Sequence, residues 1–226
     1  MTKKNQIQIY LDQQSKLFGR ELFFQSSKQN DKNLTLSNKS QDLNDEITEF
    51  YKSISLCKKC SLGHTRNKFV FGSGDPNADL MLIGEAPGEE EDLKGEPFVG
   101  RAGKLLNKIL AAIDKNRSDG VFITNVLKCR PPNNRDPLMS EIDECEPYLK
   151  KQIEIIKPKL IVALGKISGN TLLKKNTSLK DMRETIYDYF GTPLKITYHP
   201  AALLRNPILK KDAWHDFQWI RDFLKG

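Results

Sequence analysis

Four short apolar runs, each about as long as a β-strand, are spread along most of the chain. They lie at 80–83, 121–126, 160–164 and 194–198. The first and third are continuously apolar, as strands buried on both faces of a sheet are. We therefore predict four strands, at least two of which are central.

Amphipathic segments separate these runs. Apolar residues recur at the three- and four-residue spacing of one helix face, which predicts helices over 45–51, 102–113, 142–156 and 214–224. Alternation of strand and helix is typical of a parallel sheet covered by helices on both faces. We expect an α/β fold, a three-layer α/β/α sandwich with a four-stranded, mostly parallel sheet.

The first 43 residues differ from the rest in composition, being rich in Lys, Asn, Gln and Ser. Such segments bury too little apolar surface to fold alone. We predict a polar, flexible N-terminal extension over 1–43 and one folded domain over 44–226. The sequence leaves open whether this extension binds DNA, a replication clamp or no partner at all.

Composition narrows the class of protein. Of the 226 residues, 38% are hydrophobic and 29% are charged, the profile of a globular protein. No run of about 18 apolar residues predicts a membrane helix, and the first residues lack a signal-peptide pattern, so we expect a cytoplasmic protein. Because 36 Lys and Arg outnumber 29 Asp and Glu, the net charge of +7 suits a polyanionic partner, although it also serves solubility.

Polar residues follow several of the predicted strands. Glu85 follows the first, Asn133 lies in the loop after the second, and His199 follows the fourth. Ligands of open α/β sheets bind beyond the carboxyl ends of the strands. We therefore expect these three side chains to share one site.

Two loops carry apolar side chains that suit a flat ligand or a base stack. Phe98 lies in a glycine-flanked loop, where it could stack on a ligand or plug the core. Leu203, Leu204 and Arg205 combine two apolar side chains with a cation. The leucines could wedge between DNA bases or begin the packing of the last helix.

Four cysteines complete the candidate chemistry. Cys57 and Cys60 form a Cys-x-x-Cys pair, while Cys129 and Cys145 lie on separate predicted elements. In a reducing compartment this set favours a metal site over disulfides. Zinc and an iron–sulfur cluster both accept four thiolates, so the residues alone leave the metal open, as they do four unrelated buried thiols.

The chain resembles the family 4 uracil-DNA glycosylases in four ordered motifs and in its cysteines. The motifs lie at 84–92, 95–106, 125–137 and 199–205. The resemblance covers about 45–224. It implies a uracil-DNA glycosylase-like fold and removal of uracil from DNA by hydrolysis of the glycosidic bond. No lysine is placed for Schiff-base chemistry, so we expect a monofunctional enzyme that leaves an abasic site, and by default a monomer. The resemblance also implies a structural 4Fe–4S cluster held by the four cysteines, Cys57, Cys60, Cys129 and Cys145.

The resemblance assigns further roles. Phe98 would stack on the flipped uracil, Asn133 would hydrogen-bond its edge, and His199 would face its O2 atom. Glu85 and Glu91 would lie near the attacking water. The backbone around Ala86 would line the pocket. The residue types of the leucine-arginine segment 203–205, and not the resemblance, make it a candidate for DNA contact.

Three other classes are weighed against this one. A catalytically inactive DNA-binding module with the same fold, associated with replication, would be expected to lack Glu85, Asn133 or His199, and all three are present. A thiol redox protein using Cys57 and Cys60 leaves the strand-end motifs unexplained. A sister glycosylase family of wider substrate range is disfavoured by a glutamate at position 85.

Overall fold

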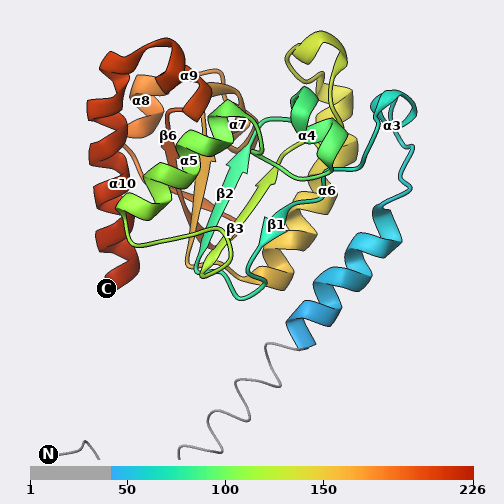
Figure 1. Cartoon of the computed structure of the whole chain (residues 1–226), viewed down its shortest axis with the longest axis horizontal. Coiled ribbons are helices and arrows are strands. Elements are labelled where there is room, and N and C mark those ends of the chain that lie inside the picture. The colour runs from blue at the N-terminus through green and yellow to red at the C-terminus, as the bar shows by residue number, and fades with distance from the viewer. Residues whose placement is uncertain (1–41) are drawn as a thin grey trace, which may run out of the picture. The chain divides into compact units, whose positions relative to one another are not determined.

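A six-stranded sheet in the order β1-β3-β2-β4-β6-β5 forms the centre of the computed structural model, which describes residues 42–226 (Figure 1). Strands β3, β2, β4 and β6 pair in parallel, whereas β1 and β5 pair antiparallel at the two edges. The strands are β1 (Ser73–Gly74), β2 (Leu80–Gly84), β3 (Val121–Asn125), β4 (Leu160–Leu164), β5 (Tyr187–Tyr189) and β6 (Thr192–Thr197).

The four parallel strands are the four predicted from the apolar runs, so the α/β prediction is confirmed. The predicted strand count of four is wrong, because two edge strands were missed. β1 has 2 residues and β5 has 3, too few to show an alternating pattern.

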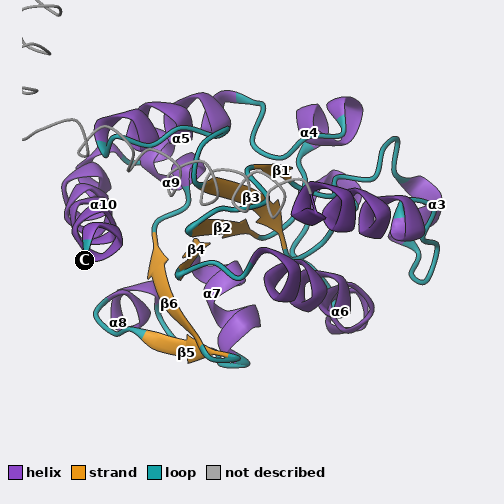
Figure 2. Ribbon diagram, turned by 90° about the horizontal axis from the view of Figure 1, so that it is seen from below, coloured by secondary structure: helices purple, strands orange, loops and turns teal. Residues whose placement is uncertain are grey.

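Helices cover both faces of the sheet, as the three-layer prediction requires (Figure 2). Side chains of β2 alternate between two cores: Leu80 and Leu82 pack with α5 and α10, while Met81 and Ile83 pack with α6 and α7. The described helices are one over 42–54, α3 (Leu62–Thr65), α4 (Glu89–Lys94), α5 (Arg101–Ala112), α6 (Met139–Ile156), α7 (Lys166–Leu173), α8 (Leu179–Arg183), α9 (Pro200–Arg205) and α10 (Lys210–Lys225).

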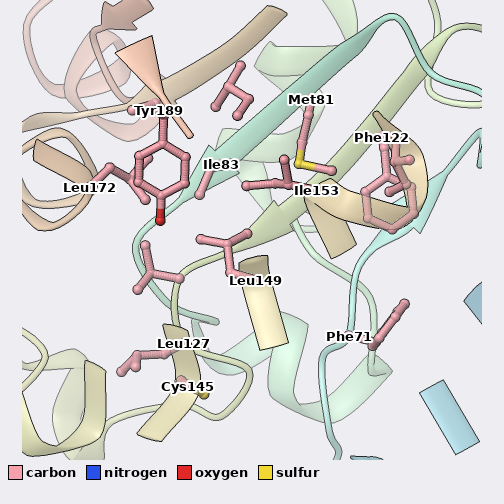
Figure 3. Close-up of a cluster of buried hydrophobic side chains, with 14 of the residues drawn as sticks. Phe71, Met81, Ile83, Phe122, Leu127, Cys145, Leu149, Ile153, Leu172 and Tyr189 are labelled. Carbon is pink, nitrogen blue, oxygen red and sulfur yellow. The ribbon is translucent and has the colours of Figure 1, made fainter. Parts of the chain in front are cut away.

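The larger core lies between the sheet and α6. Figure 3 shows Met81 and Ile83 of the sheet facing Leu149 and Ile153 of this helix. Cys145 lies at one end of the same cluster, where it is 7% exposed. The cysteine-bearing part of the fold is therefore continuous with the main core.

Two predictions concern the N-terminal extension and membrane-spanning helices. The predicted extension 1–43 lies, but for its last two residues, outside the described residues. Within 42–226, no helix is long and apolar enough to cross a membrane.

All four parallel strands end at one edge of the sheet. In Figure 1 this edge points upward, toward α4, α7 and α9. The loops that carry the motif residues start from these strand ends, so the topology gathers them in one place.

Candidate active site

A cavity of about 620 Å³ opens at the carboxyl ends of the parallel strands. Loops after β2, β3, β4 and β6 all contribute to its wall. The lining includes six residues predicted from the sequence, namely Glu85, Ala86, Glu91, Phe98, His199 and Arg205. The wall also contains residues that the sequence did not single out, namely Asn125, Asn134, Arg135, Asp136 and Lys166.

Glu85 directly follows β2, and its backbone carbonyl accepts the Leu127 N–H at 3.0 Å. Its carboxyl group is half-buried in the cavity wall. Burial, together with the negative charge of Asp136, raises the pKa of Glu85 to about 7. The side chain therefore changes its charge near neutral pH, in the range of a general base.

Glu91 lies in the first turn of α4, but its carboxylate is bound to backbone. Oε2 accepts the Gly88 N–H at 3.1 Å. Oε1 accepts the N–H groups of Val99 and Gly100 at 2.9 and 3.1 Å. Glu91 thus fastens the start of α4 to the loop that carries Phe98.

Phe98 is 6% exposed and adopts a left-handed backbone with φ of 54°. Its ring centroid lies 5.4 Å from that of His199, with a tilt of 30° between the rings. Gly84 makes room for this ring, because a Cβ there would lie 2.8 Å from it. The aromatic ring therefore serves both as a core residue and as part of the cavity wall.

His199 is the N-cap residue of α9. Its Nδ1 atom accepts the Ala201 N–H at 3.1 Å, so in the neutral ring the proton sits on Nε2. Burial, aided by the positive charge of Arg205, lowers the pKa of His199 to about 4. At neutral pH the cavity therefore holds an uncharged imidazole whose remaining donor is Nε2–H.

The structure does not place Asn133 in the cavity wall; its side chain is exposed on the loop after β3. Asn125, the last residue of β3, lines the cavity instead and is 2% exposed. It pairs in register with Gly84, and its Oδ1 would lie 2.3 Å from a Cβ added there. A polar residue closing an apolar run was the sequence signal that could have identified it.

The leucine-arginine segment divides between core and surface. Leu203 is 1% exposed and lies beside Phe217 of α10, which fits the alternative that it begins the packing of the last helix and not the alternative that it enters a base stack. Leu204 is 44% exposed on α9, and Arg205 lines the cavity. Successive residues of a helix point about 100° apart, which explains why two adjacent leucines have different surroundings.

The four cysteines, all free thiols, belong to one part of the main core. Arg66 joins two of their loops by donating to the Cys57 carbonyl at 2.6 Å and to the Cys129 Sγ at 3.2 Å. Burial raises the pKa of Cys129 to about 11, and the charges of Cys145 and Cys60 contribute to the increase. Three separate elements therefore bring their thiols within electrostatic reach of one another.

The donor set fits a thiolate-bound metal group in its chemistry. Four cysteine thiols are the usual ligands of an iron–sulfur cluster and are equally suited to zinc. Among residues 42–226, however, no three His, Cys, Asp or Glu side chains are arranged in metal-binding geometry. The residues required are thus gathered, although their thiols do not form a closed ligand shell.

Known proteins resemble this chain over most of its length. The model of the Uracil DNA glycosylase superfamily matches residues 71–220. A type-4 uracil-DNA glycosylase from Sulfurisphaera tokodaii is 46% identical over 186 residues, which cover 79% of this chain and 84% of that protein. One from Archaeoglobus fulgidus is 42% identical over 184 residues, covering 78% of this chain and 92% of that protein.

A relative of another kind is a DNA polymerase of Bacillus phage SP01. It is 30% identical over 155 residues, which cover 69% of this chain but 17% of that protein. The similarity to the type-4 enzymes is higher and spans nearly their whole length. The chain therefore belongs to the uracil-DNA glycosylase superfamily, in its type-4 family.

Proposed function

We propose that this protein removes uracil from DNA by hydrolysing the N-glycosidic bond, which leaves an abasic site. The observation that carries the proposal is the convergence of an aromatic ring, a buried amide and a neutral imidazole on one cavity. These groups are Phe98, Asn125 and His199. The names of the type-4 relatives support the same reaction.

Recognition of the base falls to Phe98 and Asn125. A base in a duplex must leave the stack to be reached by an enzyme, and an aromatic face binds the flipped base without regard to sequence. The Asn125 amide offers both a donor and an acceptor, which match O4 and N3–H of uracil and not the amino edge of cytosine. We therefore assign to Asn125 the role that the sequence had suggested for Asn133.

Bond cleavage falls to His199 and Glu85. The leaving uracil carries negative charge, so a Nε2–H donor aimed at its O2 atom stabilises charge that develops in the transition state. A carboxylate at Glu85 would stabilise the positively charged sugar and orient the attacking water. Glu91 is given no step, since its oxygens hold the Phe98 loop.

DNA contact is proposed for the surface beside α9. Exposed Leu204 can enter the gap left by the flipped base, and Arg205 can meet a phosphate. A protein of net charge +7 is suited to such a polyanion. We expect it to act as a monomer.

We further propose that Cys57, Cys60, Cys129 and Cys145 hold a 4Fe–4S cluster. When bound, the cluster supplies a covalent cross-link and takes no part in cleavage. It would join the loop between the helix over 42–54 and α3, the loop after β3, and α6. The free thiols and their shared place in the core support this assignment.

The activity is tested with an oligonucleotide that carries a single uracil. We expect strand cleavage only after alkali, and none with thymine or cytosine at the same position. Borohydride should trap no covalent complex, because the proposal includes no Schiff base. Iron-loaded protein that binds the oligonucleotide but releases no uracil would instead support the alternative of an inactive DNA-binding module. That alternative is the one associated with replication, and one relative of this chain is a DNA polymerase.

Asn125→Ala is expected to lower kcat/KM for uracil release by about 100-fold, since two hydrogen bonds of about 1–1.5 kcal/mol each are lost. The matched control is Asn133→Ala, which removes the same amide from an exposed position. It should change kcat/KM by less than about twofold. A larger loss in Asn133→Ala than in Asn125→Ala would reverse the assignment.

Glu85 predicts the pH dependence. Its pKa of about 7 means that the carboxylate is formed only as pH rises through neutrality. The value of kcat/KM, which reports groups of the substrate-free enzyme, should therefore rise between about pH 6 and pH 8 and then level off. Glu85→Gln should be slower and lose this dependence, whereas Glu89→Gln, on the exposed start of α4, should keep it. An unchanged profile in Glu85→Gln would contradict the role.

The same residue affects stability. A carboxyl whose pKa is raised by folding binds its proton more tightly in the folded state, so folding stability falls as pH rises from about 4 to above 7. Glu85→Gln should accordingly melt at a higher temperature than the parent at pH 8, and at nearly the same temperature at pH 4. Thermal unfolding at the two pH values measures the difference.

A further inference from the structure

Phe98 holds its ring in the cavity wall from an unusual backbone conformation. Its φ of 54° lies in the left-handed region, which side chains larger than glycine seldom adopt. Its carbonyl group also comes close to α5, where a Cβ at Gly103 would lie 1.6 Å from the Phe98 oxygen. The surroundings of this residue must therefore hold the conformation in place.

The side chain of Arg117 stabilises this backbone conformation on one side of Phe98. Arg117 lies in the loop between α5 and β3, and its side chain is 19% exposed. Its guanidinium donates to the Phe98 carbonyl at 2.8 Å and to the Pro97 carbonyl at 2.5 Å. The fork of a guanidinium can bind two acceptors at fixed positions, which suits two consecutive carbonyl groups.

Further contacts orient the Arg117 guanidinium. Nη2 lies 3.2 Å from the Ser73 Oγ, to which it donates, and 3.2 Å from the Glu96 Oε1. Ser73 belongs to the edge strand β1 and Glu96 to the Phe98 loop itself. Arg117 therefore ties this loop to the sheet as well as to the loop before β3.

The side chain of Glu91 stabilises the backbone on the other side of Phe98. Its carboxylate accepts the N–H groups of Val99 and Gly100, the two residues after Phe98. A cation thus binds the carbonyls of Pro97 and Phe98, and an anion binds the next two amides. The backbone on both sides of Phe98 is fixed, and with it the direction of the ring.

We propose that Arg117 is a positioning residue for base recognition: it does not line the cavity, and it sets the plane of the Phe98 ring on which the flipped base stacks. The proposal rests on the function proposed above. Loss of the guanidinium would free the Pro97 and Phe98 carbonyls and let the ring leave its place beside His199. Misplacement of a binding group by about 1 Å is enough to cost up to 100-fold in rate.

The test is a double-mutant cycle between Arg117 and Phe98, with two readouts. One is kcat/KM for uracil release. The other is the Kd for an oligonucleotide carrying 2′-fluoro-deoxyuridine, which resists cleavage and so reports binding without turnover. Arg117→Ala should raise this Kd by about tenfold and lower kcat/KM by about 10- to 100-fold, with the larger part of the loss in KM.

The cycle separates positioning from general stabilisation. In a Phe98→Ala background there is no ring to position, so Arg117→Ala should change Kd and kcat/KM by less than about twofold. Equal losses in both backgrounds would overturn the proposal, because a purely structural residue acts whether or not the ring is there. Arg221→Ala is the matched control, since this arginine is paired with its neighbour Asp222 on the surface of α10. It should leave both readouts unchanged.

Arg117→Lys keeps the test decisive if the alanine variant folds poorly. A lysine can keep the charge near Glu96 but cannot bind two carbonyls as a fork, so an intermediate loss of about threefold to tenfold is expected. Full activity in Arg117→Lys would overturn the role of the fork. If the parent protein releases no uracil at all, the proposed activity fails, yet the Kd cycle still decides whether Arg117 positions Phe98.

Discussion

Replacing His199 with alanine is expected to lower kcat for uracil release by about 10²–10³-fold, the usual cost of removing one donor from a developing negative charge. The structure fixes this donor before substrate arrives, because Nδ1 accepts the Ala201 N–H and leaves the proton on Nε2. KM should change far less than kcat, since the donor matters most when the bond breaks. Single-turnover release of uracil from a labelled oligonucleotide measures the effect.

His215→Ala is the control for this prediction. His215 is exposed on α10 and does not line the active-site cavity, so its loss should leave kcat unchanged. Because the pKa of His199 lies at about 4, this residue should add no step to the pH profile between about pH 5 and pH 9. A His199→Ala variant with kcat near that of the parent would remove the imidazole from the mechanism.

Cys145→Ser is expected to remove the proposed cluster and lower the melting temperature by about 10 °C or more. Loss of a bound metal group withdraws several kcal/mol from folding, and 1 kcal/mol corresponds to about 2–4 °C in a domain of this size. The side chain is 7% exposed in the main core, so a hydroxyl there also lacks the apolar fit of the thiol. Iron content, visible absorption and thermal unfolding of anaerobically purified protein measure the result.

Leu149→Ala separates loss of metal from loss of packing. This residue is 0% exposed on the same face of α6, and its truncation should cost about 2–5 kcal/mol through a cavity. The variant should melt earlier and keep its iron. If Cys145→Ser retained the full iron content, Cys145 would not be a ligand, and a colourless, zinc-loaded parent protein would replace the iron assignment.

The central strands were readable from the sequence, because burial on both faces leaves a continuous apolar run in β2 and β4. The edge strands were not, since each is very short: β1 has 2 residues and pairs with the distant β3, and β5 has 3 residues and pairs with β6, which follows it in the chain. Local pattern carries information about burial, but pairing partners are set by the whole fold. This difference explains why the layers were predicted and the strand count was not.

The active-site residues also divide into those that local sequence predicts and those that depend on the folded sheet. Strand-end position identified Glu85 and His199, because parallel topology brings strand ends together whatever their sequence. The choice between Asn125 and Asn133 depends on register, and the pairing of Asn125 with Gly84 is visible only in the folded sheet. The hydrogen bonds of Glu91 were not predicted for a related reason, since nothing in an acidic run reveals that one carboxylate turns back onto backbone amides.

The connection between β3 and α6 carries Cys129 at its start, and it supplies Asn134, Arg135 and Asp136 to the cavity wall. Arg135 pairs at 2.6 Å with the Glu141 carboxylate on α6, the helix that also bears Cys145. With the proposed cluster as its anchor, one wall of the pocket depends on the supply of iron. In a cell that is short of iron, or exposed to oxidants that remove clusters, this wall of the pocket would lose its fixed position. The repair activity would then be lost although every residue of the pocket is chemically unchanged.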